Sequence, residues 1–230
     1  MTDERRATAK IGFRNGGWRT SNFSTSPSRK TLAAIKQNNI MIFRAIKFVA
    51  EAHEGHYRKG TKIPYISHLM NVMKILCEND CDTEVVVAGI LHDVVEDTPV
   101  TIELVERKFG KRVAQVVAGA SEPDKIQKDT QWKASWKERK QHTIEYLRTT
   151  KDIDKLLVSC ADKLDNAKSI LQDYHELGES FWTRFNAGKE EQMWYYQSLA
   201  TVFVERGNYF GDPLLKIAKQ LDETTKAIFK

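Results

Sequence analysis

The stretch VVVAGILHDVVEDT, residues 85–98, decides the fold because it combines a strongly apolar run with clustered polar side chains. Apolar residues occupy nearly every position around a helix drawn over Thr83–Asp97, as is typical of a central buried helix. Into this segment the chain places four polar residues: His92, Asp93, Glu96 and Asp97. On a helix that advances about 100° per residue they fall within one wedge. We therefore predict a buried helix over Thr83–Asp97 with a polar wedge that faces one place.

This polar wedge requires a compensating positive charge. Three unpaired carboxylates in a core would each cost several kcal/mol, which a domain of marginal stability cannot sustain. The nearby basic residues are expected on loops or outer faces, so a divalent metal ion is the simplest solution. Imidazole nitrogen together with carboxylate oxygen suits Mn, Fe, Zn or similar ions.

Two further segments offer matching side chains. In LLVSCADKLDNAKSI, residues 156–170, the polar residues Asp162, Asn166 and Ser169 lie at i, i+4 and i+7, on one face of an otherwise apolar helix. His68 opens another apolar helix after PYIS. A lone residue of either kind is more often a satisfied core or capping residue, but their coincidence with the wedge indicates a metal site. The predicted ligands come from three helices: His68, His92, Asp93 and Asp162.

The rest of the chain has the apolar spacing of helices. Residues three and four apart predict helices over 40–53, 68–78, 101–109, 111–119, 132–149, 153–171, 189–206 and 213–228. No segment alternates like a half-buried strand. The sequence therefore predicts an all-α bundle of roughly eight to ten helices, formed by residues 31–230.

The net charge of +5 belongs to the first 30 residues, which carry seven basic and two acidic side chains. We predict that residues 1–30 form a flexible, basic N-terminal extension, either simply solvated or acting as a weak polyanion-binding or partner-docking arm. The formally neutral remainder predicts no specific nucleic-acid partner. No apolar run approaches the ~20 residues that cross a membrane, so we expect a cytoplasmic protein with reduced thiols at Cys77, Cys81 and Cys160.

Three segments together resemble a known family. They are AHEGHYRKGTKIPYISHLMNVMKIL (52–76), AGILHDVVEDTPVTIELVERKFGKRVAQVVAG (88–119) and CADKLDNAKSI (160–170). Over about residues 40–200 the chain resembles the HD-domain hydrolase region of RelA/SpoT-type enzymes, which hydrolyse the alarmones ppGpp and pppGpp. The resemblance implies an HD-domain helical bundle and a metal-dependent 3′-pyrophosphohydrolase that releases GDP or GTP.

The resemblance also implies a role for each site residue. One Mn²⁺ per chain would be held by His68, His92, Asp93 and Asp162. Glu96 and Asp97 would stand beside the attacked phosphate, where they orient the water and move its proton. The nucleotide would be bound by Arg58, which is placed to stack on guanine, and by Lys59, Asn166 and Ser169. His53 is expected to support the site without binding the metal.

Two departures from the long family members bear on which nucleotide is preferred. Asp165 stands where they usually carry His, and its negative charge would disfavour a close phosphate; Leu69 stands where they usually carry Pro. In WKERK, residues 136–140, Arg139 and Lys140 face either phosphates or solvent. The alternatives are therefore hydrolysis of another nucleotide, such as ppApp or the 2′-phosphate of NADPH, or a nucleotide-binding regulatory module without catalysis.

Overall fold

The computed structural model describes residues 29–120 and 135–230, with side chains from Gln37 onward. Residues 1–28 of the predicted extension and residues 132–134 of a predicted helix lie outside the described residues. The chain divides into two units, Met1–Lys36 and Gln37–Lys230, and the following description concerns the second unit. The predicted domain boundary at residue 30 stays a prediction.

The described residues form helices and no strand, which confirms the predicted all-α class. Tyr57 and Pro64 form an isolated β-bridge within the loop before α2. The helices are α1 (Arg29–Ala52), α2 (Ile66–Glu78), α3 (Thr83–Leu91), α4 (Val94–Asp97), α5 (Ile102–Phe109), α6 (Lys111–Ala120), α8 (Trp136–Thr149), α9 (Ile153–Leu177), the 3-10 helix η1 (Gly178–Arg184), α10 (Lys189–Phe210) and α11 (Leu214–Ile228).

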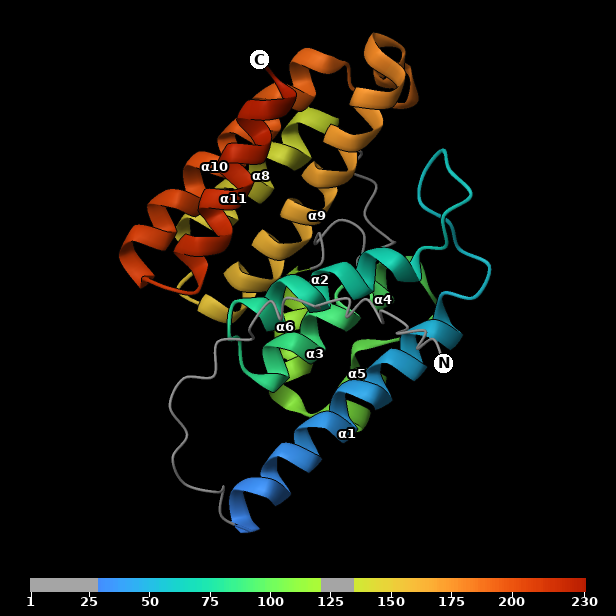
Figure 1. Cartoon of the computed structure of the whole chain (residues 1–230), viewed down its shortest axis with the longest axis vertical. Coiled ribbons are helices and arrows are strands. Elements are labelled where there is room, and N and C mark those ends of the chain that lie inside the picture. The colour runs from blue at the N-terminus through green and yellow to red at the C-terminus, as the bar shows by residue number, and fades with distance from the viewer. Residues whose placement is uncertain (1–28, 121–134) are drawn as a thin grey trace, which may run out of the picture. The chain divides into compact units, whose positions relative to one another are not determined.

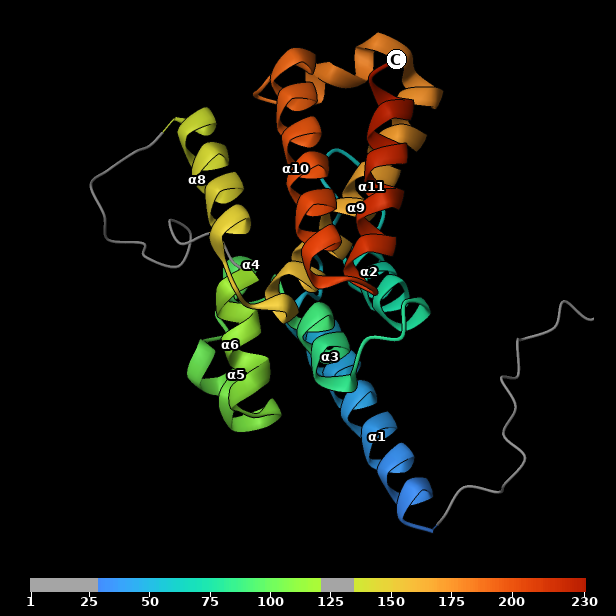
Figure 2. The same ribbon diagram turned by 90° about the vertical axis from the view of Figure 1, so that its left-hand side faces the viewer.

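Helix α9 is the central element of the bundle. It packs against α2, α3 and α6 on one side of the fold and against α10 and α11, which lie side by side in both views (Figures 1 and 2). Leu156 and Leu164 of α9 are fully buried, as are Leu69 of α2 and Val87 of α3. The apolar faces of these helices therefore form one core, and the polar residues of α9 lie at its edge.

The single helix predicted over Thr83–Asp97 is wrong, because the chain turns at His92 and Asp93 between α3 and α4. Asp93 has φ −96° and ψ −4°, in the bridge region of backbone conformations. Adjacent side chains on a continuous helix point about 100° apart, whereas the turn lets these two neighbours reach the same point. The wedge argument therefore assumed the wrong backbone, although His92 and Asp93 do lie close together.

Close packing of α2 against α3 brings the two histidines together. Gly89 makes this approach possible, since a Cβ atom at this position would lie 2.3 Å from Cδ1 of the buried Leu76. Asp82 caps the first turn of α3 by accepting hydrogen bonds from two backbone N–H groups. As a result, the ring centroids of His68 and His92 lie 5.2 Å apart.

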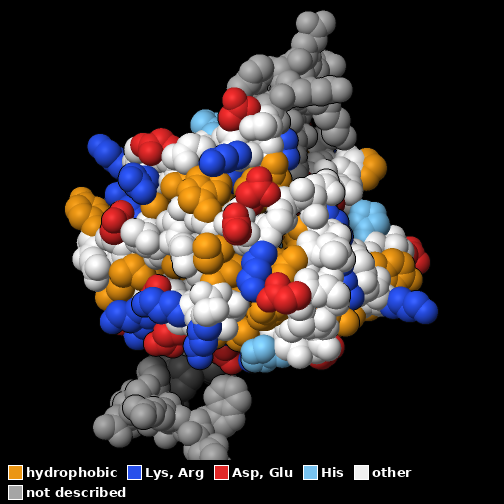
Figure 3. Space-filling view, turned by 90° about the horizontal axis from the view of Figure 1, so that it is seen from above, with side chains coloured by type: hydrophobic (Ala, Val, Ile, Leu, Met, Phe, Trp, Pro, Cys, Tyr) orange, Lys and Arg blue, Asp and Glu red, His pale blue; other side chains and the backbone are white. Residues whose placement is uncertain are grey.

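Basic and acidic side chains are interspersed over the face of the molecule shown in Figure 3. That face carries both signs of charge, as the formally neutral composition of residues 31–230 predicts. Within the described ranges, no helix combines the length and the apolar character that a membrane crossing requires.

Candidate metal centre

Four side-chain atoms converge where α2, the α3–α4 turn and α9 meet. His68 Nε2 lies 3.2 Å from Asp162 Oδ1 and 3.7 Å from Asp93 Oδ2. His92 Nε2 lies 2.9 Å from Asp93 Oδ2 and 3.7 Å from Asp162 Oδ1. Donors about 2.1 Å from one ion, at ordinary coordination angles, are separated by about 3.0–3.6 Å. His68, His92 and Asp162 therefore form a group that could hold a single divalent ion, and Asp93, the fourth predicted ligand, lies beside both histidines.

Each histidine is oriented through its other ring nitrogen. His68 Nδ1–H donates to Asp165 Oδ2 at 2.6 Å, and His92 Nδ1–H donates to the Gly89 carbonyl at 2.8 Å. Because carboxylate and carbonyl oxygens only accept, both Nδ1 atoms carry the proton and both Nε2 atoms are directed to the metal position. Such partners fix the tautomer and raise the basicity of a metal-binding imidazole.

The two aspartates are held by polar neighbours. Lys163 Nζ donates to Asp162 Oδ2 at 2.7 Å, while Asn166 Nδ2 donates to Asp162 Oδ1 at 2.5 Å. The Tyr65 hydroxyl donates to Asp93 Oδ2 at 2.5 Å. The expectation that nearby basic residues lie on loops or outer faces is therefore wrong for Lys163, which offsets part of the buried negative charge.

The charges of the site shift its pKa values strongly. Burial by itself would lower the pKa of His68, but hydrogen bonds to Asp162 and Asp165 outweigh burial and raise it. The pKa of His92 is likewise raised, because nearby Asp93 and Asp162 outweigh burial. Burial would raise the pKa of Asp93, yet the neighbouring His92 holds it below its ordinary value. The centre thus favours ionised carboxylates, whose charge a bound cation would balance.

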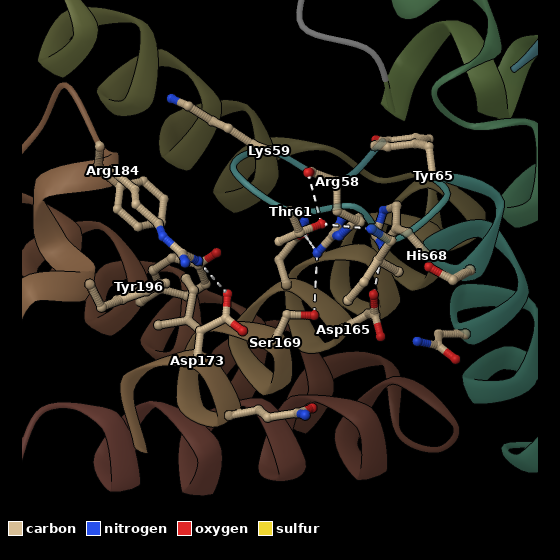
Figure 4. Close-up of a pocket in the computed structure, with 18 residues that line it drawn as sticks. Arg58, Lys59, Thr61, Tyr65, His68, Asp165, Ser169, Asp173, Arg184 and Tyr196 are labelled. Carbon is tan, nitrogen blue, oxygen red and sulfur yellow. Dashed lines mark hydrogen bonds and ion pairs between the residues drawn. The ribbon is translucent and has the colours of Figure 1, made fainter. Parts of the chain in front are cut away.

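A cavity of about 400 Å³ opens beside the metal position. Its lining includes all four predicted nucleotide-binding residues, Arg58, Lys59, Asn166 and Ser169, together with His68. Arg58 Nη2 donates to Asn166 Oδ1 at 2.9 Å and to Ser169 Oγ at 3.3 Å. Figure 4 shows Arg58 between His68 on one side and Arg184 on the other. Hydrogen bonds through Asn166 therefore link the pocket arginine to the candidate metal ligand Asp162.

The two predicted catalytic carboxylates follow the metal-binding turn but do not line this cavity. Glu96 is half-buried and Asp97 is exposed, both on α4. Asp97 is close enough to contribute to the raised pKa of Tyr65, after burial and the nearby Asp93. Their roles beside the phosphate stay a prediction.

Arg139 and Lys140 are half-buried, so both alternatives for them, phosphate contact and a solvent-facing position, stay predictions. Lys140 Nζ lies 5.0 Å from the ring centroid of the buried Tyr195, which places it over α10 and outside the lining of the cavity. Their predicted contact with phosphates stays a prediction.

Sequence reasoning missed several residues around the centre. The Tyr65 hydroxyl donates to Asp93, and the Tyr65 ring stacks on that of His53 with centroids 5.2 Å apart. The supporting role of His53 stays a prediction. Asp165 was considered only for its effect on a nearby phosphate, whereas the structure shows that it accepts a hydrogen bond from His68. The signal for both was their spacing of three residues from a metal ligand, Tyr65 before His68 and Asp165 after Asp162.

Comparison with known proteins relates this geometry to characterised relatives. The chain is 36% identical over 141 residues to a guanosine-3′,5′-bis(diphosphate) 3′-pyrophosphohydrolase of Aquifex aeolicus, covering 61% of this chain and 19% of the relative. It is 34% identical over 142 residues to the bifunctional (p)ppGpp synthase/hydrolase SpoT of Escherichia coli, covering 59% and 19%. The chain thus spans about a fifth of the length of these relatives.

Solved structures give matches of similar length to this chain. A Listeria monocytogenes EGD-e protein superposes with a TM-score of 0.60 at 35% identity, covering 74% of this chain and all of that one. A metazoan orthologue of SpoT that hydrolyses ppGpp and plays a role in starvation responses superposes with a TM-score of 0.59 at 26% identity, covering 90% and 97%. The sequence pattern of the HD domain matches residues 45–191, a range that contains every candidate metal ligand. The chain belongs to the HD-domain family.

Proposed function

We propose that this protein hydrolyses the 3′-pyrophosphate of guanosine alarmones, releasing pyrophosphate and GDP or GTP. The observation that carries the proposal is the buried group of His68, His92 and Asp162, with the half-buried Asp93 beside both histidines. Asn166 joins Asp162 of this group to Arg58 in the adjoining cavity. Relatives and structural neighbours that act on ppGpp support the choice of substrate. The small-molecule partner is therefore a nucleotide that carries phosphate at its 3′ position.

We infer that the metal is one Mn²⁺ ion. Its proposed ligands are two imidazole nitrogens and two carboxylate oxygens, a mixed donor set that suits Mn, Fe or Zn. When bound, such an ion would polarise a phosphoryl oxygen and lower the pKa of water at the site.

Side chains of this protein would transfer the proton and bind the nucleotide. Glu96 and Asp97 would orient the attacking water and accept its proton. Arg58 would bind the nucleotide with a guanidinium group that can both stack and form forked hydrogen bonds. Asn166 and Ser169, which already bind Arg58, would contact the sugar or base.

The test begins with protein stripped of metal by a chelator and reloaded separately with Mn²⁺, Mg²⁺, Zn²⁺ or Fe²⁺. Elemental analysis of the untreated protein identifies the native ion. Each form is then assayed on ppGpp, ppApp and NADPH side by side. We expect Mn²⁺-dependent release of pyrophosphate from ppGpp and little turnover of the other two nucleotides.

Variants separate catalysis from binding. Asp93→Asn and Glu96→Gln should each lower kcat on ppGpp by roughly 100-fold or more, as expected for a metal ligand and for a group that transfers a proton. Asp222→Asn, in an ion pair with Lys226 on α11, serves as the matched control and should retain activity. If only ppApp or NADPH is turned over, that nucleotide replaces ppGpp as the proposed substrate. If wild type is no faster than Asp93→Asn, the protein is a nucleotide-binding module without catalysis.

A further inference from the structure

We propose that Asp173 and Arg184 form a base-reading pair that selects guanine at the end of the cavity away from the metal. Arg184 Nη1 lies 3.2 Å from Asp173 Oδ2, and both side chains line the cavity. In Figure 4 this ion pair lies at the opposite end from His68, with Arg58 and Ser169 between them. The inference deepens the proposed function and rests on it for placing the attacked phosphate at the metal centre.

The geometry of α9 places Asp173 in line with the metal centre. Asp162, Asn166, Ser169 and Asp173 lie at i, i+4, i+7 and i+11, within about 60° of one another around the helix. Asp173 lies about 16 Å along the helix axis from Asp162, at 1.5 Å per residue. A nucleotide lying along this face, with its phosphate at the metal, therefore extends toward Asp173.

The walls at this end of the cavity suit a flat ring. The lining includes Phe181 and Phe185 beside Ile170 of α9. The Arg184 guanidinium lies 5.8 Å from the Phe181 ring centroid, and Lys59 Nζ lies 5.8 Å from that of Phe185. A nucleobase has apolar faces and polar edges, so it matches apolar walls that end in an ion pair.

The ion pair favours a base over a second phosphate. Asp173 would repel a phosphate placed against Arg184, whereas a carboxylate has about four sites that accept hydrogen bonds, so it can bind N–H groups beside Arg184. Guanine offers two adjacent donors, N1–H and the 2-amino group, while adenine offers one amino group beside an acceptor nitrogen. Arg184 acts as a positioning residue that holds Asp173 toward the base.

Isothermal titration calorimetry of the Mn²⁺-loaded protein with GDP, IDP, XDP and ADP tests the base preference. IDP lacks the 2-amino group of guanine, and XDP carries a carbonyl oxygen there. We expect wild type to bind GDP at least roughly tenfold more tightly than each of the others, because each of them leaves the Asp173 carboxylate without one of the donors that guanine supplies. Equal affinity for all four nucleotides, or no binding of GDP, overturns the proposal.

Asp173→Asn supplies a gain of function that a misfolded variant cannot show. The amide can donate to the xanthine carbonyl, so the variant should bind XDP more tightly than GDP, reversing the wild-type order. The matched control Asp222→Asn changes an ion-paired aspartate of similar exposure, 33% against 30% for Asp173, and should keep the wild-type order. An unchanged order in Asp173→Asn overturns the base-reading role.

The variant Arg184→Gln separates this role from anion binding. We expect this variant to bind GDP roughly tenfold more weakly and to bind ADP with a much smaller loss, because only guanine binds the Asp173 carboxylate that Arg184 positions. An equal loss for both nucleotides would show a phosphate site and overturn the proposal. If wild type does not turn over ppGpp but Asp173→Asn prefers XDP to GDP, the proposed reaction is rejected and the role of Asp173 in base recognition is kept. If wild type turns over ppGpp but Asp173→Asn still prefers GDP, the proposed reaction is kept and the role of Asp173 is rejected.

Discussion

Asp165 is a residue whose role depends on a single hydrogen bond. It stands where long RelA/SpoT-type enzymes usually carry His, it is 4% exposed, and it accepts a hydrogen bond from His68 Nδ1–H. The neutral carbonyl of Gly89 has the same function for His92. The His68 imidazole is therefore a stronger electron donor to a metal than that of His92, because its partner Asp165 is charged.

Asp165→Asn should lower the affinity for Mn²⁺ by about 10–100-fold, since it removes the charge that raises the basicity of His68. Isothermal titration calorimetry, in which Mn²⁺ is added to the metal-stripped protein, measures this change in affinity. Circular dichroism checks that the helices are retained. Wild-type affinity in the folded variant would show that Asp165 fills space without tuning the ligand.

His53 makes the stability of the protein sensitive to acid. Burial lowers its pKa to about 4, although the nearby Asp93 acts in the opposite direction. The unfolded chain, with a histidine pKa of about 6.5, then binds more protons than the folded chain between these two values. The free energy of unfolding should therefore fall by about 1–3 kcal/mol as the pH falls from 7 to 4.5.

Urea unfolding at a series of pH values measures this fall. In His53→Gln the contribution of this histidine is absent, so the curve of unfolding free energy against pH should be flatter over that range. Parallel curves for the variant and the wild type would assign the acid sensitivity to other groups.

At the scale of elements, the approach of α2 to α3 depends on Gly89. In Gly89→Ala the new methyl group must displace Leu76, which is fully buried. Overpacking of this kind costs about 1–3 kcal/mol, more than the gain of about 1 kcal/mol in helix propensity. We expect a net loss of stability of up to about 2 kcal/mol by urea unfolding, together with weaker Mn²⁺ binding.

Gly119→Ala is the matched control. A Cβ there would meet the Lys155 side chain, whose Cε lies at 2.2 Å but which is long and partly exposed, so it can move aside. Its stability should equal or exceed that of the wild type. A similar loss of stability in both variants would show that the effect does not come from the packing of α2 against α3 at Gly89.

Periodicity predicted nearly every helix but not the details that complete the site. The apolar spacing of α9 and α10 repeats over many turns, so the central residues of both helices could be predicted from the sequence. The turn at His92 and Asp93 was not, because both residues are compatible with a continuous helix. The 3-10 helix η1, which carries Arg184, is too short to produce a periodic signal.

The same distinction holds within the site. His68 and Asp162 could be predicted because a charged or imidazole side chain in an apolar helix requires a partner. Asp165 binding to His68 could not, since the two residues are 97 positions apart and their contact depends on how α2 packs against α9. Local spacing identifies the residues of a polar face, while the packing of helices determines their partners.

For the whole molecule, the candidate metal centre brings together segments that are distant in sequence. His68 belongs to α2, Asp93 to the α3–α4 turn and Asp162 to α9. An ion bound by all three stabilises only the folded state, by about 2.7 kcal/mol when its concentration is 100 times Kd.

Removal of the metal by a chelator should therefore lower the Tm by several degrees, and added Mn²⁺ should restore it in a concentration-dependent manner. Differential scanning calorimetry of wild type and Asp162→Asn measures both effects, and the variant should lose most of the response to Mn²⁺. The same response in the variant would place the stabilising ion elsewhere.

The straight polar face of α9 also limits how the protein can evolve. Substitutions along the helix can change one contact at a time, but the insertion of one residue between Ser169 and Asp173 would rotate everything beyond it by about 100°. Asp173 would leave the cavity while Asp162 stayed in place. We therefore expect relatives that share this site to keep the same number of residues between these two positions.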